Sequence, residues 1–105
     1  MESFIQITTT TESKEQAKKI TDFLVAQKLA ACVQIMGPVE STYRWKGKVE
    51  NTQEWLCLVK TTAELYDKVE AAIKSLHSYE MPEIVAVPII KGSEEYLGWL
   101  GNESA

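Results

Sequence analysis

His77 is the only histidine in the chain and the first candidate for metal or proton chemistry. It follows an expected helix, whose dipole would favour the protonated ring, and an imidazole there could ligate a metal or carry a proton. Metal sites normally combine several His, Cys, Asp or Glu ligands. Only Glu80 and Glu83 lie near His77, without a recognisable ligand spacing. A structural role, in which His77 caps the helix by bonding its last carbonyls, is therefore better supported.

The two cysteines, Cys32 and Cys57, both lie inside apolar segments. Nucleophilic chemistry would require one of them to sit beside His77 with a lowered thiol pKa. Thiols within strands usually behave as small buried hydrophobes, so both are expected to be inert. A disulfide between them is formally possible, but an intracellular chain argues against it.

Aromatic and charged residues suggest a binding cleft as a second possibility. Such aromatic side chains are more often core or interface anchors than ligand cages. Glu54 and Lys60 are six residues apart on one expected strand, so they share a face. At about 3.3 Å per residue they are too distant to pair, so we expect each to find a partner elsewhere, in a neighbouring subunit. The residues that would line the cleft are Trp45, Glu54, Lys60, His77 and Tyr79, and the aromatic set considered also includes Tyr43, Trp55 and Trp99.

Composition limits the classes of partner. The chain has 105 residues, 45% of them hydrophobic, and a net charge of −4, which fits a single globular domain over residues 1–105. No basic run marks a surface for nucleic acid or an anionic membrane. The N-terminus shows no signal-peptide pattern, and no apolar run approaches the roughly 20 residues of a membrane span, so we expect a cytoplasmic protein.

Hydrophobic periodicity predicts an alternation of strands and helices. Strands are expected at 4–10, 30–36, 39–45, 49–60 and 84–90, and helices from 14 to about 29, from about 62 to 76, and after Gly92-Ser93. Gly37-Pro38 is either a turn or a bend within one long strand. Gly47 predicts a tight hairpin turn with positive φ, and Pro88 predicts an edge strand.

Helix starts and buried faces are also predicted. Ser13 with Gln16, and Thr61 with Glu64, match the capping-box spacing at a helix N-terminus. Apolar residues then recur at helical spacing and define the buried stripes. The first stripe comprises Ala17, Ile20, Leu24 and Val25, widened by Phe23, Ala26 and Leu29, and the second comprises Leu65, Val69, Ala72, Ile73 and Leu76.

The element order is typical of an α+β, ferredoxin-like split βαβ fold with an antiparallel sheet, a long hairpin and an extra C-terminal helix. Helices would cover one face of the sheet. The segment 53–59 ends in a run that is apolar on both sides, so the other face should be buried against another subunit. A charge at Leu58 is therefore expected to weaken folding and assembly together.

Five ordered motifs spanning nearly the whole chain resemble the CutA family of divalent-cation-tolerance proteins. They are Lys28 to Val33, Ser41 to Lys48, Glu54 with Leu58 to Thr61, His77 to Ile84, and Tyr96 to Leu100. The resemblance implies a ferredoxin-like protomer in a tight trimer, similar in shape to PII signalling proteins, and a link to copper and other divalent cations. Family members with proposed copper ligands carry a second His and an early Cys where this chain has Leu76 and Thr9. In the loop that usually reads His-Pro-Tyr, Ser78 replaces the proline, and His77 is the ligand that remains.

We therefore expect a non-enzymatic homotrimer of divalent-metal tolerance that binds Cu(II) or another divalent cation weakly through His77. The alternative is a PII-like signalling or scaffold trimer that binds a small anion in clefts between subunits, lined by Trp45, Glu54, Lys60 and Tyr79. Neither interpretation requires nucleic acid or a membrane as partner. Nothing in the motifs supports an enzyme.

Overall fold

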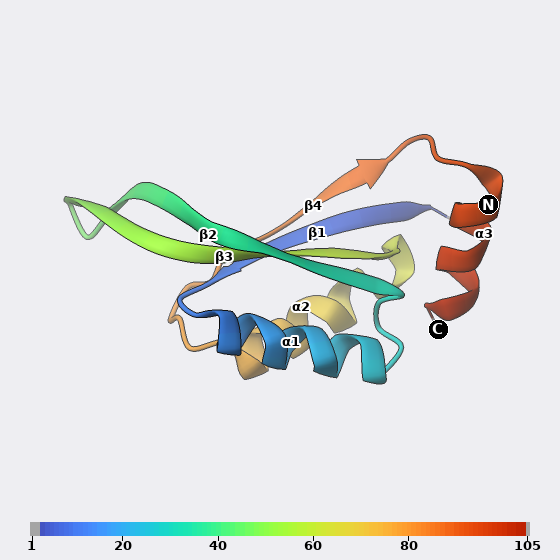
Figure 1. Cartoon of the computed structure of the whole chain (residues 1–105), viewed down its shortest axis with the longest axis horizontal. Helices are drawn as coiled ribbons and strands as arrows, with labels where there is room; N and C mark the ends of the chain where they lie inside the picture. Colours follow the sequence, from blue (N-terminus) through green and yellow to red (C-terminus); the bar gives the residue numbers. More distant parts are fainter. Residues whose placement is uncertain (1–2, 105) are drawn as a thin grey trace.

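The computed structural model describes residues 3–104, which form four strands, three α-helices and one short 3-10 turn (Figure 1). The elements in chain order are β1 (Phe4–Thr11), α1 (Lys14–Ala26), β2 (Cys32–Trp45), β3 (Lys48–Thr62), η1 (Ala63–Leu65), α2 (Tyr66–Leu76), β4 (Ile84–Ile89) and α3 (Glu94–Glu103). No helix in this described part of the chain is both long enough and apolar enough to cross a bilayer.

The four strands form one antiparallel sheet in the order β2-β3-β1-β4. Helices α1 and α2 lie side by side on one face of the sheet, and α3 stands at the end of the sheet opposite the hairpin (Figure 1). This arrangement confirms the predicted α+β, ferredoxin-like fold. Strand β4, with Pro88, lies at the sheet edge as predicted, where a missing backbone N–H is tolerated.

The core lies between the sheet and the two helices. Its sheet side comes from alternate residues, because side chains point to opposite faces of a strand with period two. Phe23 and Val25 are 39% and 43% exposed, so the first helix buries a narrower stripe than its sequence suggested. The fully buried apolar residues include Ile7, Cys57 and Val59 from the strands, and Ala17, Ile20, Leu24, Val69 and Ile73 from the helices.

Within residues 3–104, no helical layer spans the opposite face of the sheet, and only α3 contacts β3 at one end, where Tyr96 lies near Lys60. Leu58 aligns with Thr8 of β1 and Gln34 of β2, and its side chain alternates with the buried Cys57 and Val59. We call this surface the open face, and its apolar members are Met36, Leu56, Leu58, Val85 and Val87. Met36, Val85 and Val87 are each more than half exposed.

Strands β2 and β3 form a hairpin that extends well beyond β1 (Figure 1). Gly37-Pro38 is a bend within one 14-residue strand, at a register shift between Met36 and Val39. A Cβ atom on Gly37 would lie 2.7 Å from the Trp55 ring, so this position requires glycine. At the hairpin tip Gly47 has φ of 82°, as predicted for a tight turn.

The helix termini differ in part from the sequence-based expectations. Helix α1 ends at Ala26, before the expected residue 28 or 29, and Lys28 takes a left-handed φ of 58°. The Ser13 hydroxyl accepts the N–H of Gln16 as expected. The Gln16 side chain, however, donates to the carbonyl of Leu76 at 2.7 Å instead of closing the capping box, and so joins α1 to the end of α2.

The prediction that Thr61 caps the second helix is wrong. Thr61 is fully buried in β3, and its hydroxyl donates to the carbonyl of Leu29 at 2.7 Å. The chain enters α2 through η1 instead, without a side-chain cap. Ser93, by contrast, caps α3 as predicted, since its hydroxyl accepts the N–H of Tyr96.

Candidate functional site

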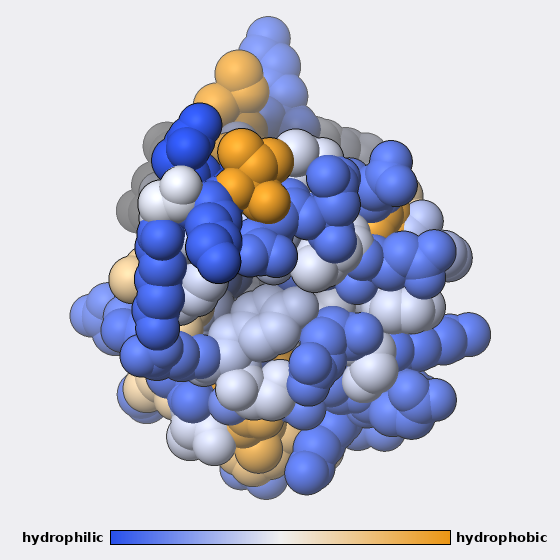
Figure 2. All heavy atoms as spheres, turned by 90° about the vertical axis from the view of Figure 1, so that its left-hand side faces the viewer, coloured by the Kyte–Doolittle hydropathy of each residue, from blue (hydrophilic) through white to orange (hydrophobic). Residues whose placement is uncertain are grey.

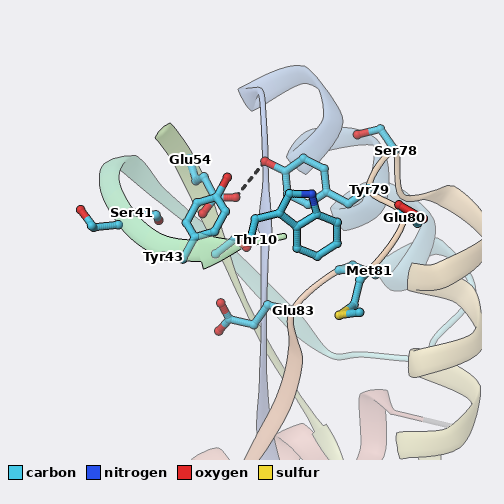
Figure 3. Close-up of a pocket in the computed structure, with 12 residues that line it drawn as sticks. Thr10, Ser41, Tyr43, Glu54, Ser78, Tyr79, Glu80, Met81 and Glu83 are labelled. Carbon is cyan, nitrogen blue, oxygen red and sulfur yellow. Dashed lines mark hydrogen bonds between the residues drawn. The ribbon is translucent and has the colours of Figure 1, made fainter. Parts of the chain in front are cut away.

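A cleft lies where the outer half of the β2–β3 hairpin faces the loop between α2 and β4. Its volume is about 780 Å³. Figure 3 shows Tyr43 and Glu54 on the hairpin side and Tyr79, Met81 and Glu83 on the loop side. The complete lining is Thr10, Ser41, Thr42, Tyr43, Trp45, Glu54, Ser78, Tyr79, Glu80, Met81, Pro82 and Glu83.

His77 anchors the loop that forms one wall of this cleft. Its Nε2 lies 2.7 Å from the carbonyl oxygen of Thr10, and its Nδ1 accepts the N–H of Tyr79 at 3.0 Å. A carbonyl requires a donor and an N–H requires an acceptor, so Nε2 carries the hydrogen and Nδ1 does not. The backbone N–H of His77 donates to the carbonyl of Ile73 at the end of α2, as in a helix cap. The imidazole of His77, however, bonds to the Thr10 carbonyl of β1 and not to the last carbonyls of the helix.

This geometry does not fit a resident metal ion at His77. A metal needs an imidazole lone pair, and the one on Nδ1 already accepts the Tyr79 N–H. No group of three or more His, Cys, Asp or Glu side chains is placed to hold a metal ion within residues 3–104. The ring therefore serves to position the loop.

Tyr79 joins the loop to the hairpin through Glu54. The Tyr79 hydroxyl donates to Oε2 of Glu54 at 2.8 Å, and Glu54 is only 6% exposed. Burial, followed by the bond to Glu54, raises the pKa of Tyr79 well above its ordinary value, so the phenol stays a donor. Tyr79 is therefore a hydrogen-bond partner of Glu54 within the same chain, and the expected partner in a neighbouring subunit stays a prediction.

Comparison with known proteins identifies the family. The profile described as "CutA1 divalent ion tolerance protein" matches residues 5–103, nearly the whole chain. The chain belongs to the CutA1 family.

Relatives of this CutA1-family chain come from bacteria, archaea, plants and animals. It is 48% identical over 100 residues to the divalent-cation tolerance protein CutA of Thermus thermophilus, covering 95% of each chain. The crystal structure of CutA1 from Oryza sativa superposes with a TM-score of 0.95 at 38% identity, covering 98% of this chain and 94% of that one. The chloroplastic CutA of Arabidopsis thaliana is 39% identical, and the match spans only 55% of its length.

The CutA1-family fold separates the residues that the sequence grouped as one cleft. Trp45, Glu54 and Tyr79 all line it. Lys60 does not, because it lies toward the far end of β3, where its Nζ donates to Gln34 and sits 5.6 Å from the centre of the Tyr96 ring. Of the other aromatics considered, Trp55 packs against the core and Trp99 lies in α3 beside Tyr96.

Sequence reasoning missed several residues of the cleft. Ser41 and Met81 were not considered, and Glu83 was weighed only as a metal ligand. The alternation of Ser41, Tyr43 and Trp45 along one strand was the available signal, because these positions share a face. The cleft wall contains Glu54, Glu80 and Glu83 but no lysine or arginine. Its charge is therefore negative, which disfavours the anionic ligand considered from the sequence.

The cysteines of this CutA1-family chain are both free. Burial raises the pKa of the Cys57 thiol, and the Thr21 hydroxyl lowers it by less, so Cys57 is a poor nucleophile. Cys32 aligns with Lys60 in the sheet register, and its position therefore belongs to the open face instead of the cleft.

Tyr79→Phe should destabilise the protein by about 1.5–3 kcal/mol at neutral pH, because it removes the hydroxyl that donates to a buried carboxylate. Urea unfolding at a fixed protein concentration measures the difference. Tyr66→Phe is the matched control, since Tyr66 lies on α2 away from the cleft. Equal stability of Tyr79→Phe and the wild type would show that the Glu54 bond contributes nothing.

Proposed function

We propose that this chain works as a homotrimeric, non-enzymatic protein of divalent-cation tolerance. Family membership supports the tolerance role, since the matching relative from Thermus thermophilus carries that name. The exposed apolar side chains of the open face support the homotrimer. The way in which the histidine and cysteine side chains are held supports a role without catalysis.

The open face is the observation that carries the assembly. Met36, Val85 and Val87 are 53%, 51% and 52% exposed on the same face of the sheet as Leu56 and Leu58, with the polar residues of β1 lying between β4 and β3. A sheet face that exposes several large apolar side chains is suited to a protein interface. Within residues 3–104, α1 and α2 cover the other face and α3 contacts only one end of this one, so copies of the chain are the natural cover for the rest.

The sheet edges favour a ring over a simple dimer. Strands β2 and β4 are the two edges of the sheet, and they differ in length, with 14 and 6 residues. Joining two different edges gives a head-to-tail contact, which closes into a ring when the rotation permits. A trimer is the smallest such ring.

The non-enzymatic role is supported by how the reactive side chains are held. Both ring nitrogens of His77 are engaged in hydrogen bonds, so neither is free to accept a substrate proton. Cys57 is buried and its pKa is raised, which suppresses the thiolate.

Copper enters this proposal as a cation to be tolerated. For a cupric ion to bind Nδ1 of His77, the Tyr79 N–H would have to give up its acceptor. Such a site has only one nitrogen ligand, and the protein loses a hydrogen bond when the ion binds. We therefore expect a cupric ion to bind there weakly.

A growth experiment tests the proposal. A bacterial strain that lacks its own CutA-family protein would express the wild-type chain or a variant that cannot assemble, Leu58→Asp, at rising cupric concentration. We expect the wild type to restore growth and the variant to fail at equal expression. Growth that is the same with and without the wild-type chain would refute the tolerance role.

A further inference from the structure

The β2–β3 hairpin contains one residue too many for a regular ladder. On β2, Gly37 and Pro38 stand between two regular pairs, whereas on β3 only Trp55 stands between the same pairs. Two residues opposite one define a β-bulge, which bends its strand and increases the local twist. Trp55 is also the partner of Thr11, the last residue of β1. The bulge therefore lies where the hairpin leaves the four-stranded sheet.

Two separate constraints account for the extra residue. Toward the core, burial sets the pairing, since Ile35 pairs with the fully buried Cys57. Toward the tip, a two-residue turn sets the pairing, because Lys46 and Gly47 have φ of 51° and 82°, as a tight hairpin turn requires. These two registers differ by one residue, and the bulge is the point at which the chain changes from one to the other.

The bulge also decides which face of the hairpin carries the aromatic side chains. Before it, Met36 lies on the open face, so an unbroken alternation would place Tyr43 and Trp45 on the side of the helices. In the structure Trp45 pairs with Lys48, which lies an even number of residues from Leu56 on the unbroken strand β3. The aromatic side chains of the outer β2 therefore continue the open face.

The packing at Gly37 fixes the bend. A Cβ atom there would lie 2.7 Å from Cδ1 and 3.0 Å from Cγ of Trp55, and 3.1 Å from the carbonyl oxygen of Glu54. The Trp55 indole in turn packs against the buried core. The bulge is thus closed against a ring that the core holds in place.

The tip of the hairpin contributes little apolar packing of its own. Figure 2 faces the hairpin end of the molecule and shows a mainly hydrophilic surface with small apolar patches. The direction of the hairpin is therefore set where it leaves the sheet, at the bulge, and not by burial at its tip.

We propose that the bulge at Gly37-Pro38 is a fixed bend that aims the outer half of the hairpin, residues 39–54, at the loop after α2. Glu54, the first residue of β3 on the tip side of the bulge, accepts the Tyr79 hydroxyl of that loop at 2.8 Å. Tyr43, further along the hairpin, lines the same cleft (Figure 3). The bend closes the cleft within one chain, and it also gives the open face its shape for assembly, a part that rests on the proposed function.

Deletion of Pro38 tests the bend. Gly37 alone would then stand opposite Trp55, so both registers persist in a regular ladder, and circular dichroism should show the wild-type secondary structure. In urea unfolding at one protein concentration, Tyr79→Phe should lower the midpoint of the wild-type protein. The same substitution should leave the midpoint of the deletion variant unchanged, because Glu54 no longer meets the loop. A deletion variant that keeps the whole Tyr79→Phe shift would overturn the proposal.

A second variant decides the outcome if the deletion variant does not fold. Gly37→Ala places a Cβ atom against the Trp55 ring, so the bulge must shift and the Tyr79→Phe effect on the midpoint should shrink. Gly98→Ala on α3 is the matched control, because a Cβ atom there meets nothing within 4 Å, and it should keep the full effect. An undiminished Tyr79→Phe effect in Gly37→Ala would reject the bend.

Sedimentation of the same proteins separates this inference from the proposed assembly. We expect a trimer for the wild type and for Gly98→Ala, and monomers for the Pro38 deletion. If the wild-type chain is itself a monomer, the proposed trimer fails, while the Tyr79→Phe comparison still decides the role of the bulge. A deletion variant that stays trimeric would show that assembly does not need the bend.

Discussion

Leu58→Asp should convert the proposed homotrimer into folded monomers. Leu58 points to the open face, away from the helices, and is half-buried within a single chain. In the assembly, each copy would place an unpaired carboxylate in an apolar contact, at a cost of several kcal/mol per charge. The combined free-energy cost of three such charges exceeds the binding free energy that a subunit interface of ordinary size provides.

The sequence alone predicted that a charge at Leu58 would weaken folding and assembly together. Because the Leu58 side chain points away from the core, we now expect the charge to weaken assembly more than folding. Sedimentation should show monomer mass at micromolar concentration, while circular dichroism keeps the wild-type secondary structure. Leu58→Met is the matched control, because it conserves volume and apolarity and should stay trimeric. A trimer that survives Leu58→Asp would exclude the open face as the interface.

Val59→Asp, one residue further along β3, should instead prevent folding. Val59 is fully buried, lies opposite Ile7 in the register with β1, and belongs to the core under α1 and α2. The substitution loses about 1.5–3 kcal/mol of apolar burial and adds an unpaired buried charge. Together these approach the total stability of a small domain, about 5–15 kcal/mol.

Circular dichroism and urea unfolding of Val59→Asp should show loss of the cooperative transition. Val59→Ala, which leaves a cavity without a charge, should stay folded with a smaller loss of about 1–3 kcal/mol. All variants need one protein concentration, because assembly contributes to apparent stability. A folded Val59→Asp monomer would mean that the two faces of β3 were assigned the wrong way round.

Local patterns in the sequence determined much of this fold. The alternation along residues 55–59 showed that one strand is apolar on both faces, and the structure places Leu56 and Leu58 opposite Cys57 and Val59. The stripe of α2, the tight turn at Gly47 and the cap at Ser93 also appear as predicted. These features depend on neighbours a few residues away, so composition and spacing suffice to predict them.

The candidate site, by contrast, was decided by tertiary structure. His77 bonds Thr10 across 67 residues, and Tyr79 bonds Glu54 across 25. Neither bond has a local sequence signal, because each depends on the register of the sheet and on the path of a loop. The same holds for Lys60, which shares a strand face with Glu54 but lies too far along it to join the cleft. Sequence periodicity determines which face a side chain occupies, while only the packed chain determines which distant group it meets there.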